Sequence, residues 1–396
     1  MATAGIALAQ GPADSTPKPD SGKPPKPPPI AFFLARGEPD ACGAGCSEWI
    51  AADGTIDQAA PQRLRALLQR LGKRKLPIYF HSPGGSVEGA IALGRLMRAR
   101  QLTAGVARTI PQGCDRSRDR ESACDALKRS GRELPAELRT VPTLCNSSCV
   151  YALIGAAARE VAAGAQLGVH SAVVVAYHRN GGAPSAKVPA RLKAAALARA
   201  NERIERYLAS MGIDRALFRM ASEVSHERVR YLTRDEMGRF GIDRRDFHES
   251  RWMAEEGPSG AAAVVKFATA VKAGEPKQYR VMQLLLACGR PGFITVGFAR
   301  DLDPADRLAS AALAASGSEV MLSPGRAQPT VRPNGVEMEI WVAPAPRTFF
   351  DGAARGDTIE IVEMPAIALP NAPPRRLKLS TAGLPASIDA LAQHCR

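Results

Sequence analysis

Residues 76–98 read LPIYFHSPGGSVEGAIALGRLMR and decide the fold of the N-terminal part of the chain. The stretch from Leu76 to Phe80 is short and apolar, which predicts a buried strand that ends at the break Pro83-Gly84-Gly85. From Ser86 to Arg98 apolar residues recur at helical spacing, so a helix should begin directly after the glycines. We therefore expect a strand, a glycine turn and a helix in direct succession.

Two further segments supply the other parts of a hydrolase site. Ser147 stands at the start of a helix predicted over 147–158, and His170 lies on a strand predicted over 167–175. The spacing of 23 residues (170 − 147) fits a helix followed by an antiparallel return into the sheet. Acyl transfer needs an activated nucleophile and a base that contributes roughly 10²–10⁴ in rate, and these are the roles we expect for Ser147 and His170.

Backbone N–H groups near the glycine turn are the candidate oxyanion donors. A glycine lets its N–H approach a carbonyl oxygen because it has no Cβ, and a helix N-terminus favours negative charge. The candidates are the N–H groups of Gly84, Gly85 and Ser148. Each element alone has an ordinary structural interpretation as a turn, a helix cap or a core histidine, and His81 is a competing base.

These segments resemble the three active-site segments of the Clp protease/crotonase-like superfamily, with most similarity to an exported bacterial branch that has a Cys-x-Ser-x-Cys nucleophile segment. The residues that carry the resemblance are Ser82-Pro83-Gly84-Gly85-Ser86-Val87, Cys145-Asn146-Ser147-Ser148-Cys149 and Gly168-Val169-His170-Ser171. It runs from about Pro77 to Ile242, and residues 231–237 with 240–242 resemble the closing strand and helix. It implies a spiral of ββα units and a serine peptidase with a Ser-His-Asp triad, in which Ser147 is the nucleophile and His170 the base.

The chain departs from that family where the acid of the triad should stand. Before the closing strand the sequence reads Glu223-Val224-Ser225-His226-Glu227, without an aspartate. Glu223 or Glu227 could orient His170, or the enzyme could work as a dyad. The alternative function is an inactive envelope scaffold or binding protein on the same fold.

Composition and net charge limit the classes of partner that the protein can have. The 396 residues are 45% hydrophobic, yet no apolar run reaches the roughly 18–20 residues that span a bilayer. The net charge of +14 favours contact with anionic envelope surfaces, whereas the absence of zinc-finger or RNP motifs argues against specific nucleic-acid binding. We expect a peptide or protein substrate and neither a metal nor an organic cofactor. Relatives of the fold often assemble as trimers, hexamers or heptameric rings, so the resemblance makes a homo-oligomer one possible assembly.

The N-terminus and the cysteines favour export. Ala7-Leu8-Ala9 before Gln10 matches the small-x-small cleavage site of a secretory signal, and the Pro- and Lys-rich residues up to Ile30 predict an extended arm. The number of cysteines is even and their spacing does not suit zinc, which favours disulfides. We therefore expect a periplasmic or secreted protein. The eight candidates are Cys42, Cys46, Cys114, Cys124, Cys145, Cys149, Cys288 and Cys395.

The predicted architecture is α/β, with a Clp/crotonase-like domain over 31–255 followed by a smaller β-rich domain over 256–396. In the first domain, residues 189–211 form an amphipathic pattern, closed by Gly212, whose inward positions are Leu192, Ala196, Ala200, Ile204 and Leu208. In the second, short alternating apolar runs separated by Gly, Pro and Asp predict strands. The clearest runs are 281–286, 293–298, 336–342 and 358–362.

Overall fold

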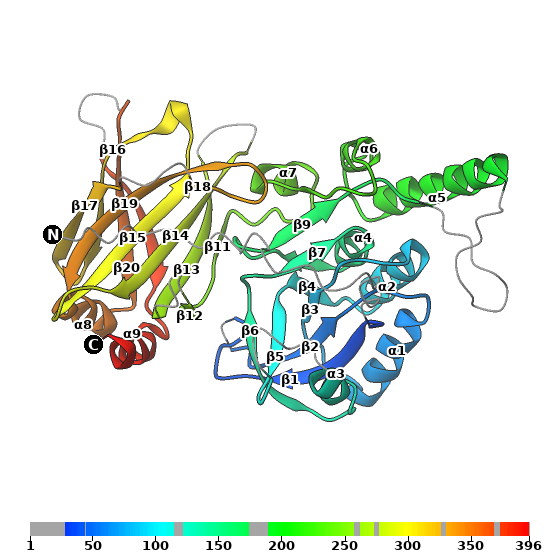
Figure 1. The fold of residues 1–396 in the computed structure, drawn as a ribbon, viewed down its shortest axis with the longest axis horizontal. Coiled ribbons are helices and arrows are strands. Elements are labelled where there is room, and N and C mark those ends of the chain that lie inside the picture. The colour runs from blue at the N-terminus through cyan, green and yellow to red at the C-terminus, as the bar shows by residue number, and fades with distance from the viewer. Residues whose placement is uncertain are drawn as a thin grey trace, which may run out of the picture. The chain divides into compact units, whose positions relative to one another are not determined.

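The chain folds into two compact units of mixed α/β structure (Figure 1). The first unit comprises the described residues up to Arg244, and the second begins at Arg245. Of the predicted N-terminal arm, residues 1–27 lie outside the described part of the chain. The computed structural model describes residues 28–43, 45–114, 122–173, 189–256, 262–272, 277–325, 330–367 and 373–395.

A seven-stranded sheet in the order β5-β6-β1-β2-β3-β4-β8 forms the centre of the first unit. Strands β2, β3, β4 and β8 run parallel, whereas β1 pairs antiparallel with β2. All four residues of β3 are buried, as expected for a parallel strand that is covered on both faces. The strands are β1 (Ala31–Arg36), β2 (Glu48–Asp53), β3 (Ile78–His81), β4 (Thr103–Val106), β5 (Arg108–Pro111), β6 (Leu134–Arg139) and β8 (Ala158–Glu160).

The helices of this unit begin with the one predicted after the glycines. Ser86 caps α2 by accepting a hydrogen bond from the Gly89 N–H, so the predicted order of strand, glycine turn and helix is confirmed. In Figure 1, α1 and α2 lie on the same side of the sheet. The helices are α1 (Ala60–Leu71), α2 (Val87–Ala99), α3 (Ser122–Lys128), α4 (Ser148–Ile154), α5 (Ala190–Ser210), α6 (Ala216–Glu223) and α7 (Arg234–Arg239).

A small second sheet, in the order β10-β9-β7, carries the segments around Ser147 and His170. Its strands are β7 (Leu144–Asn146), β9 (Gln166–Val169) and β10 (Arg230–Tyr231). Strands β7 and β9 run parallel, so the predicted antiparallel return is wrong. Helix α4 connects β7 to the following strands, and a helix between two neighbouring strands of one sheet is the usual connection of a parallel pair.

The inward positions predicted for α5 are correct only at its C-terminal end. Ile204 and Leu208 are fully buried, Ala196 and Ala200 are half-buried, and Leu192 is 53% exposed. A periodic pattern shows which face of a helix is apolar, but it does not show whether another element covers that face.

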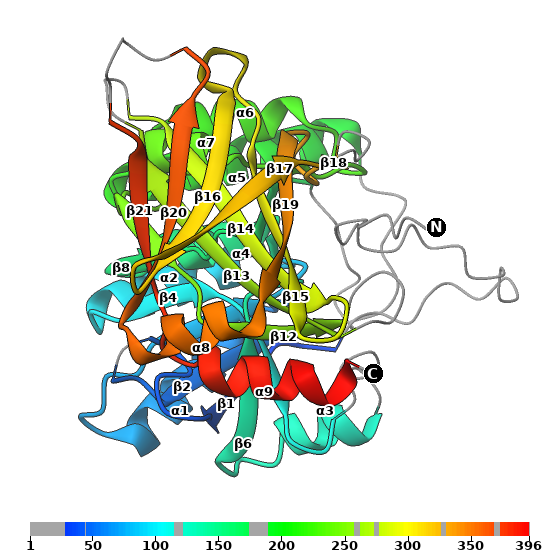
Figure 2. The same ribbon diagram turned by 90° about the vertical axis from the view of Figure 1, so that its left-hand side faces the viewer.

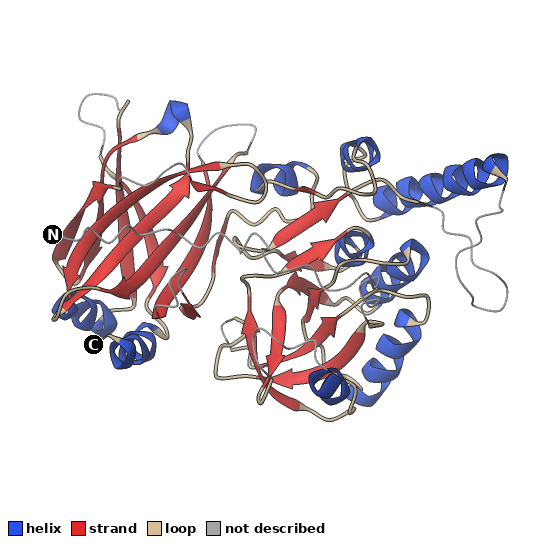
Figure 3. Cartoon of the chain, in the orientation of Figure 1, coloured by secondary structure: helices blue, strands red, loops and turns tan. Residues whose placement is uncertain are grey.

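The second unit is built mainly of strands (Figure 3), with α8 (Arg347–Arg355) and α9 (Leu384–His394) at one end of its sheet (Figure 2). Strands β11 and β12 pair with β13, so the predicted boundary at 255–256 falls inside this sheet. The β-strands are β11 (Phe247–Glu249), β12 (Met253–Glu256), β13 (Ala262–Val271), β14 (Tyr279–Cys288), β15 (Phe293–Asp301), β16 (Leu308–Ala315), β17 (Ser318–Pro324), β18 (Thr330–Val331), β19 (Glu337–Pro346), β20 (Thr358–Pro365) and β21 (Arg375–Ser380).

The structure pairs the cysteines into four disulfides, each within one unit. They are Cys42–Cys46, Cys114–Cys124, Cys145–Cys149 and Cys288–Cys395. Among the described residues, no helix is both long and apolar enough to span a bilayer.

Candidate active site

Ser147 lies at the junction between β7 and α4 in an unusual backbone conformation. Its φ of 56° and ψ of −126° place it in a region that costs a non-glycine residue about 1–3 kcal/mol. Its N–H donates to the carbonyl of Gly168 at 2.7 Å. Although Ser147 is the N-cap residue of α4, its hydroxyl makes no capping hydrogen bond. The hydroxyl therefore stands on a sharp strand-to-helix turn, an arrangement that presents a nucleophile in other hydrolases.

Helix α4 is held firmly behind Ser147. A Cβ on Gly155 would lie 2.1 Å from the Cα of Gly94, so the glycines allow α4 and α2 to pack closely. The Tyr207 hydroxyl donates to the Tyr151 carbonyl at 2.9 Å and ties α5 to α4. Burial raises the pKa of Tyr151 to about 12 and also raises the pKa of Tyr207. Both phenols stay neutral near pH 7, so the bond from the Tyr207 hydroxyl to α4 does not depend on pH in this range.

The glycine turn lies directly against the nucleophile strand. The Ser82 N–H donates to the Leu144 carbonyl and the Ser82 carbonyl accepts from the Asn146 N–H, both at 3.0 Å. Gly84 has a φ of 100°, and a Cβ there would lie 2.7 Å from the Cβ of Ser147. Only glycine fits at position 84, both because of its backbone conformation and because Ser147 occupies the space.

The two glycines of the turn use their N–H groups differently. Gly84 is buried and its N–H donates to the Ser82 hydroxyl at 3.1 Å. Gly85 is exposed, and among the described residues its N–H has no acceptor. The segment at Ile56 binds the glycine turn through the Gly84 carbonyl and the Ser86 N–H. The Gly85 N–H therefore points away from Ile56. Gly84 thus allows the turn to pack against Ser147, and Gly85 offers its N–H as a free hydrogen-bond donor.

Ser148 supplies the second candidate donor. It is the first residue of α4, and within the described part of the chain its N–H has no acceptor, as is usual in the first turn of a helix. The Ser148 nitrogen lies 3.1 Å from the position that a Cβ on Gly84 would take, so it also borders the glycine turn.

His170 follows the end of β9, beside the end of β7. Because β7 and β9 are parallel neighbours, their carboxyl ends meet at one edge, and Ser147 and His170 each lie just beyond such an end. The Nδ1 of His170 lies 2.9 Å from the Ser171 carbonyl. A carbonyl only accepts, so Nδ1 donates to it, and in the neutral tautomer that this bond selects Nε2 is the acceptor. The structure records no hydrogen bond between His170 and Ser147.

The predicted acids are not brought to His170. Glu223 and Glu227 are both exposed, and neither forms a hydrogen bond or an ion pair with the imidazole in the structure. The Ser171 carbonyl occupies the place at Nδ1 where a triad acid would bind.

The competing base His81 is directed elsewhere. Its side chain is buried, and its Nδ1 faces the Leu144 N–H at 3.4 Å and the Thr143 hydroxyl at 3.3 Å. These contacts give His81 a structural role at the start of β7.

Three polar side chains around the site were given no role by the sequence. Ser82 binds Gly84, while the Asn146 Oδ1 and the Ser148 Oγ are buried without a hydrogen-bond partner among the described residues. All three lie inside the segments that carry the resemblance, but their residue types alone do not show which of them form hydrogen bonds in the folded protein.

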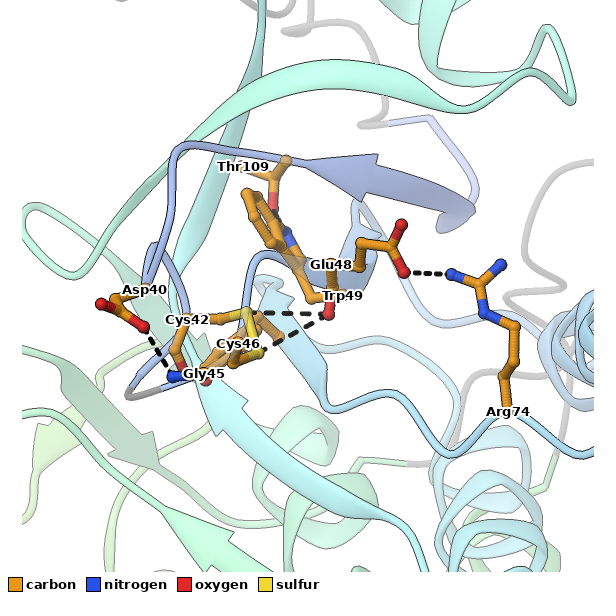
Figure 4. The surroundings of a disulfide bond; sticks show 9 residues. Asp40, Cys42, Gly45, Cys46, Glu48, Trp49, Arg74 and Thr109 are labelled. Atoms are coloured by element: carbon orange, nitrogen blue, oxygen red, sulfur yellow. Dashed lines mark hydrogen bonds and ion pairs between the residues drawn. A yellow bond between two sulfur atoms is a disulfide. The ribbon is translucent and has the colours of Figure 1, made fainter.

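A cavity of about 650 Å³ lies away from these residues, beside the Cys42–Cys46 disulfide. Figure 4 shows the loop that borders it, where the Gly45 N–H donates to Asp40 at 2.6 Å and Arg74 pairs with Glu48. None of the cavity's lining residues belongs to the Ser147 and His170 segments, so this cavity is not part of the candidate site.

No profile of a known protein family matches the chain, and no curated protein matches it. Among solved structures, the chain is similar to a point mutant of ClpP1 from Listeria monocytogenes. The identity is 15%, the match covers 48% of this chain and 85% of that one, and the TM-score is 0.30. The roles considered for the site residues rest on the local geometry described above.

Proposed function

We propose that this chain is an exported serine hydrolase of the peptidase type, with Ser147 as its nucleophile. The observation that carries the proposal is the conformation of Ser147. Ser147 is held at positive φ by its N–H bond to the Gly168 carbonyl, and a glycine packs against its Cβ, while its hydroxyl is left without a capping hydrogen bond.

The proposed chemistry is acyl transfer. The Ser147 hydroxyl attacks the acyl carbon of a peptide or ester, and Nε2 of His170 accepts its proton. The N–H groups of Gly85 and Ser148 donate to the oxyanion that forms. The imidazolium then gives its proton to the leaving group, and water, activated by the same imidazole, hydrolyses the acyl-enzyme.

We propose a dyad, in which the Ser171 carbonyl orients His170. The carbonyl fixes the tautomer through Nδ1, which a general base requires. It carries no full negative charge, so it stabilises the imidazolium less than a carboxylate does. The proposed enzyme should therefore turn over more slowly than one with a complete triad. A movement of Glu223 or Glu227 toward His170 is not needed.

The cysteines and the net charge support the proposed cellular location and the proposed partners. Four disulfides are typical of proteins that fold in an oxidising compartment, which supports a periplasmic or secreted location. The proposed substrate is a peptide or protein of the envelope. The net charge of +14 supports contact with an anionic envelope surface, and a homo-oligomer is part of the proposal. We assign the first unit to the Clp/crotonase-like spiral and give the β-rich unit no role in the proposed chemistry.

One observation favours a second candidate function, a non-catalytic scaffold. In the described residues His170 has no carboxylate partner and makes no hydrogen bond to Ser147. Catalytic hydrogen bonds are often long before substrate binds, so this geometry is compatible with both functions.

Labelling with a fluorophosphonate probe distinguishes the serine hydrolase from the non-catalytic scaffold. We expect the oxidised full chain to be labelled, Ser147→Ala to lose all labelling, and the control Ser86→Ala, which alters the cap of α2, to be labelled. Absence of labelling in well-folded protein would support the scaffold, and labelling that persists in Ser147→Ala would assign the reactivity to another residue.

A further inference from the structure

Ser82 joins the glycine turn to the nucleophile strand through all of its polar groups. Its side chain is fully buried, although serine is usually exposed. Its N–H and carbonyl bind the backbone of β7 on either side of Cys145, and its hydroxyl accepts from the Gly84 N–H. One residue thus fixes the position of the turn relative to Ser147.

We propose that Ser82 is a positioning residue of the hydrolase, whose hydroxyl fixes the Pro83–Gly84 peptide and so, together with the Ile56 N–H that binds the Gly84 carbonyl at 2.8 Å, holds the Gly85 N–H toward the substrate. This inference rests on the proposed function. It assigns the oxyanion donor to Gly85 and not to Gly84, because the Gly84 N–H is already bonded within the protein.

The backbone of the turn needs such a restraint. Gly84 and Gly85 have φ values of 100° and 139°, and without Cβ atoms their peptides rotate more freely than those of any other residue. Pro83 has no N–H and therefore cannot supply a hydrogen bond of its own. The Ser82 hydroxyl is the acceptor that the structure gives to the Gly84 N–H, so it fixes the Pro83–Gly84 peptide, whereas the Ile56 N–H fixes the next peptide by binding the Gly84 carbonyl at 2.8 Å.

Loss of this hydroxyl has two consequences. The buried Gly84 N–H is left without an acceptor, which favours rotation toward any other acceptor nearby, including the substrate oxygen. Because the two peptides meet at the Cα of Gly84, such a rotation also shifts the Gly84–Gly85 peptide, which then keeps only its bond to the Ile56 N–H, and this displaces the Gly85 N–H from the position in which it binds the oxyanion. Removal of one oxyanion donor lowers the rate about 10²–10³-fold in other enzymes, and a misplaced donor should cost a part of that.

The test compares two serines that make the same bond. Ser86 also accepts a backbone N–H, that of Gly89, at 3.1 Å, but it caps α2 on the far side of the turn. We expect Ser82→Ala to lower the maximal rate of fluorophosphonate labelling by about 10–100-fold, with the half-saturating probe concentration changed less than about 3-fold. Ser86→Ala should label at the wild-type rate with a lower melting temperature, and Ser82→Thr, which keeps the hydroxyl, should restore the rate.

A second measurement uses the unaltered protein and does not depend on folding of a variant. Residue-resolved hydrogen exchange should show a protected Gly84 amide and a rapidly exchanging Gly85 amide. Fast exchange at Gly84 with protection at Gly85 would overturn the inference, as would a wild-type labelling rate in folded Ser82→Ala. If the wild-type chain is not labelled at all, the proposed function fails and the hydrogen-exchange result still decides the geometry.

Discussion

At the scale of single residues, Ser147 combines a strained backbone with a hydroxyl that the fold does not use. Glycine adopts positive φ without strain, so Ser147→Gly should release the strain and Ser147→Ala should keep it. Because both variants lack the hydroxyl, their difference isolates the backbone. We expect Ser147→Gly to be about 1 kcal/mol more stable than Ser147→Ala in urea denaturation. Equal stability, or a more stable alanine variant, would mean that Ser147 is not strained.

The residues of the site could be placed by their order along the sequence, but their roles could not. Glycines after a strand and a serine before a helix are local patterns, and the structure brings Gly84 against Ser147. Gly84 and Gly85 look identical in sequence, and only their hydrogen bonds separate a packing residue from a donor. The sequence also did not show that the Ser171 carbonyl binds His170, because every residue has a backbone carbonyl and the sequence does not distinguish one from another.

At the scale of elements, the Cys145–Cys149 disulfide closes the turn that carries Ser147. Both cysteines are fully buried, and the bridge joins the end of β7 to the first turn of α4. We expect the double variant Cys145→Ala/Cys149→Ala to label much more slowly, because the positive-φ turn is then free to relax. The measurement is the rate of fluorophosphonate labelling in protein whose folding is confirmed by circular dichroism.

The Cys42–Cys46 disulfide gives a matched control, because its sequence separation is also 4. Loops of this length predict a similar loss of stability for each pair, about 2 kcal/mol. Only the Cys145/Cys149 variant should lose labelling rate. If both variants slow equally, the effect comes from general destabilisation and not from the nucleophile turn.

The elements themselves could be predicted where short-range pattern decides them. The strand before the glycines and α2 after them follow from apolar spacing and from the cap at Ser86. The direction of β9 and the exposure of Leu192 depend on which elements pack together, and that information is not local. The same limit explains why β11 and β12 were assigned to the wrong side of the domain boundary.

At the scale of the whole molecule, each unit has its own core and its own disulfides. In the core of the second unit, Arg300 is completely buried and pairs with Glu339 at 2.5 Å and with Glu363 at 3.2 Å. A buried charge is tolerated only when such partners are present. The units are therefore expected to be separate folding domains.

This division predicts that the first unit is sufficient for the proposed chemistry. Every contact described for Ser147, His170 and the glycine turn lies between residues 28 and 244, and three disulfides lie in the same range. A fragment ending at Arg244 should therefore fold under oxidising conditions and be labelled at a rate within about 3-fold of the full chain. The fragment from Arg245 should fold with Cys288–Cys395 oxidised and remain unlabelled. A folded first fragment that is not labelled, beside a labelled full chain, would show that the β-rich unit contributes to the site.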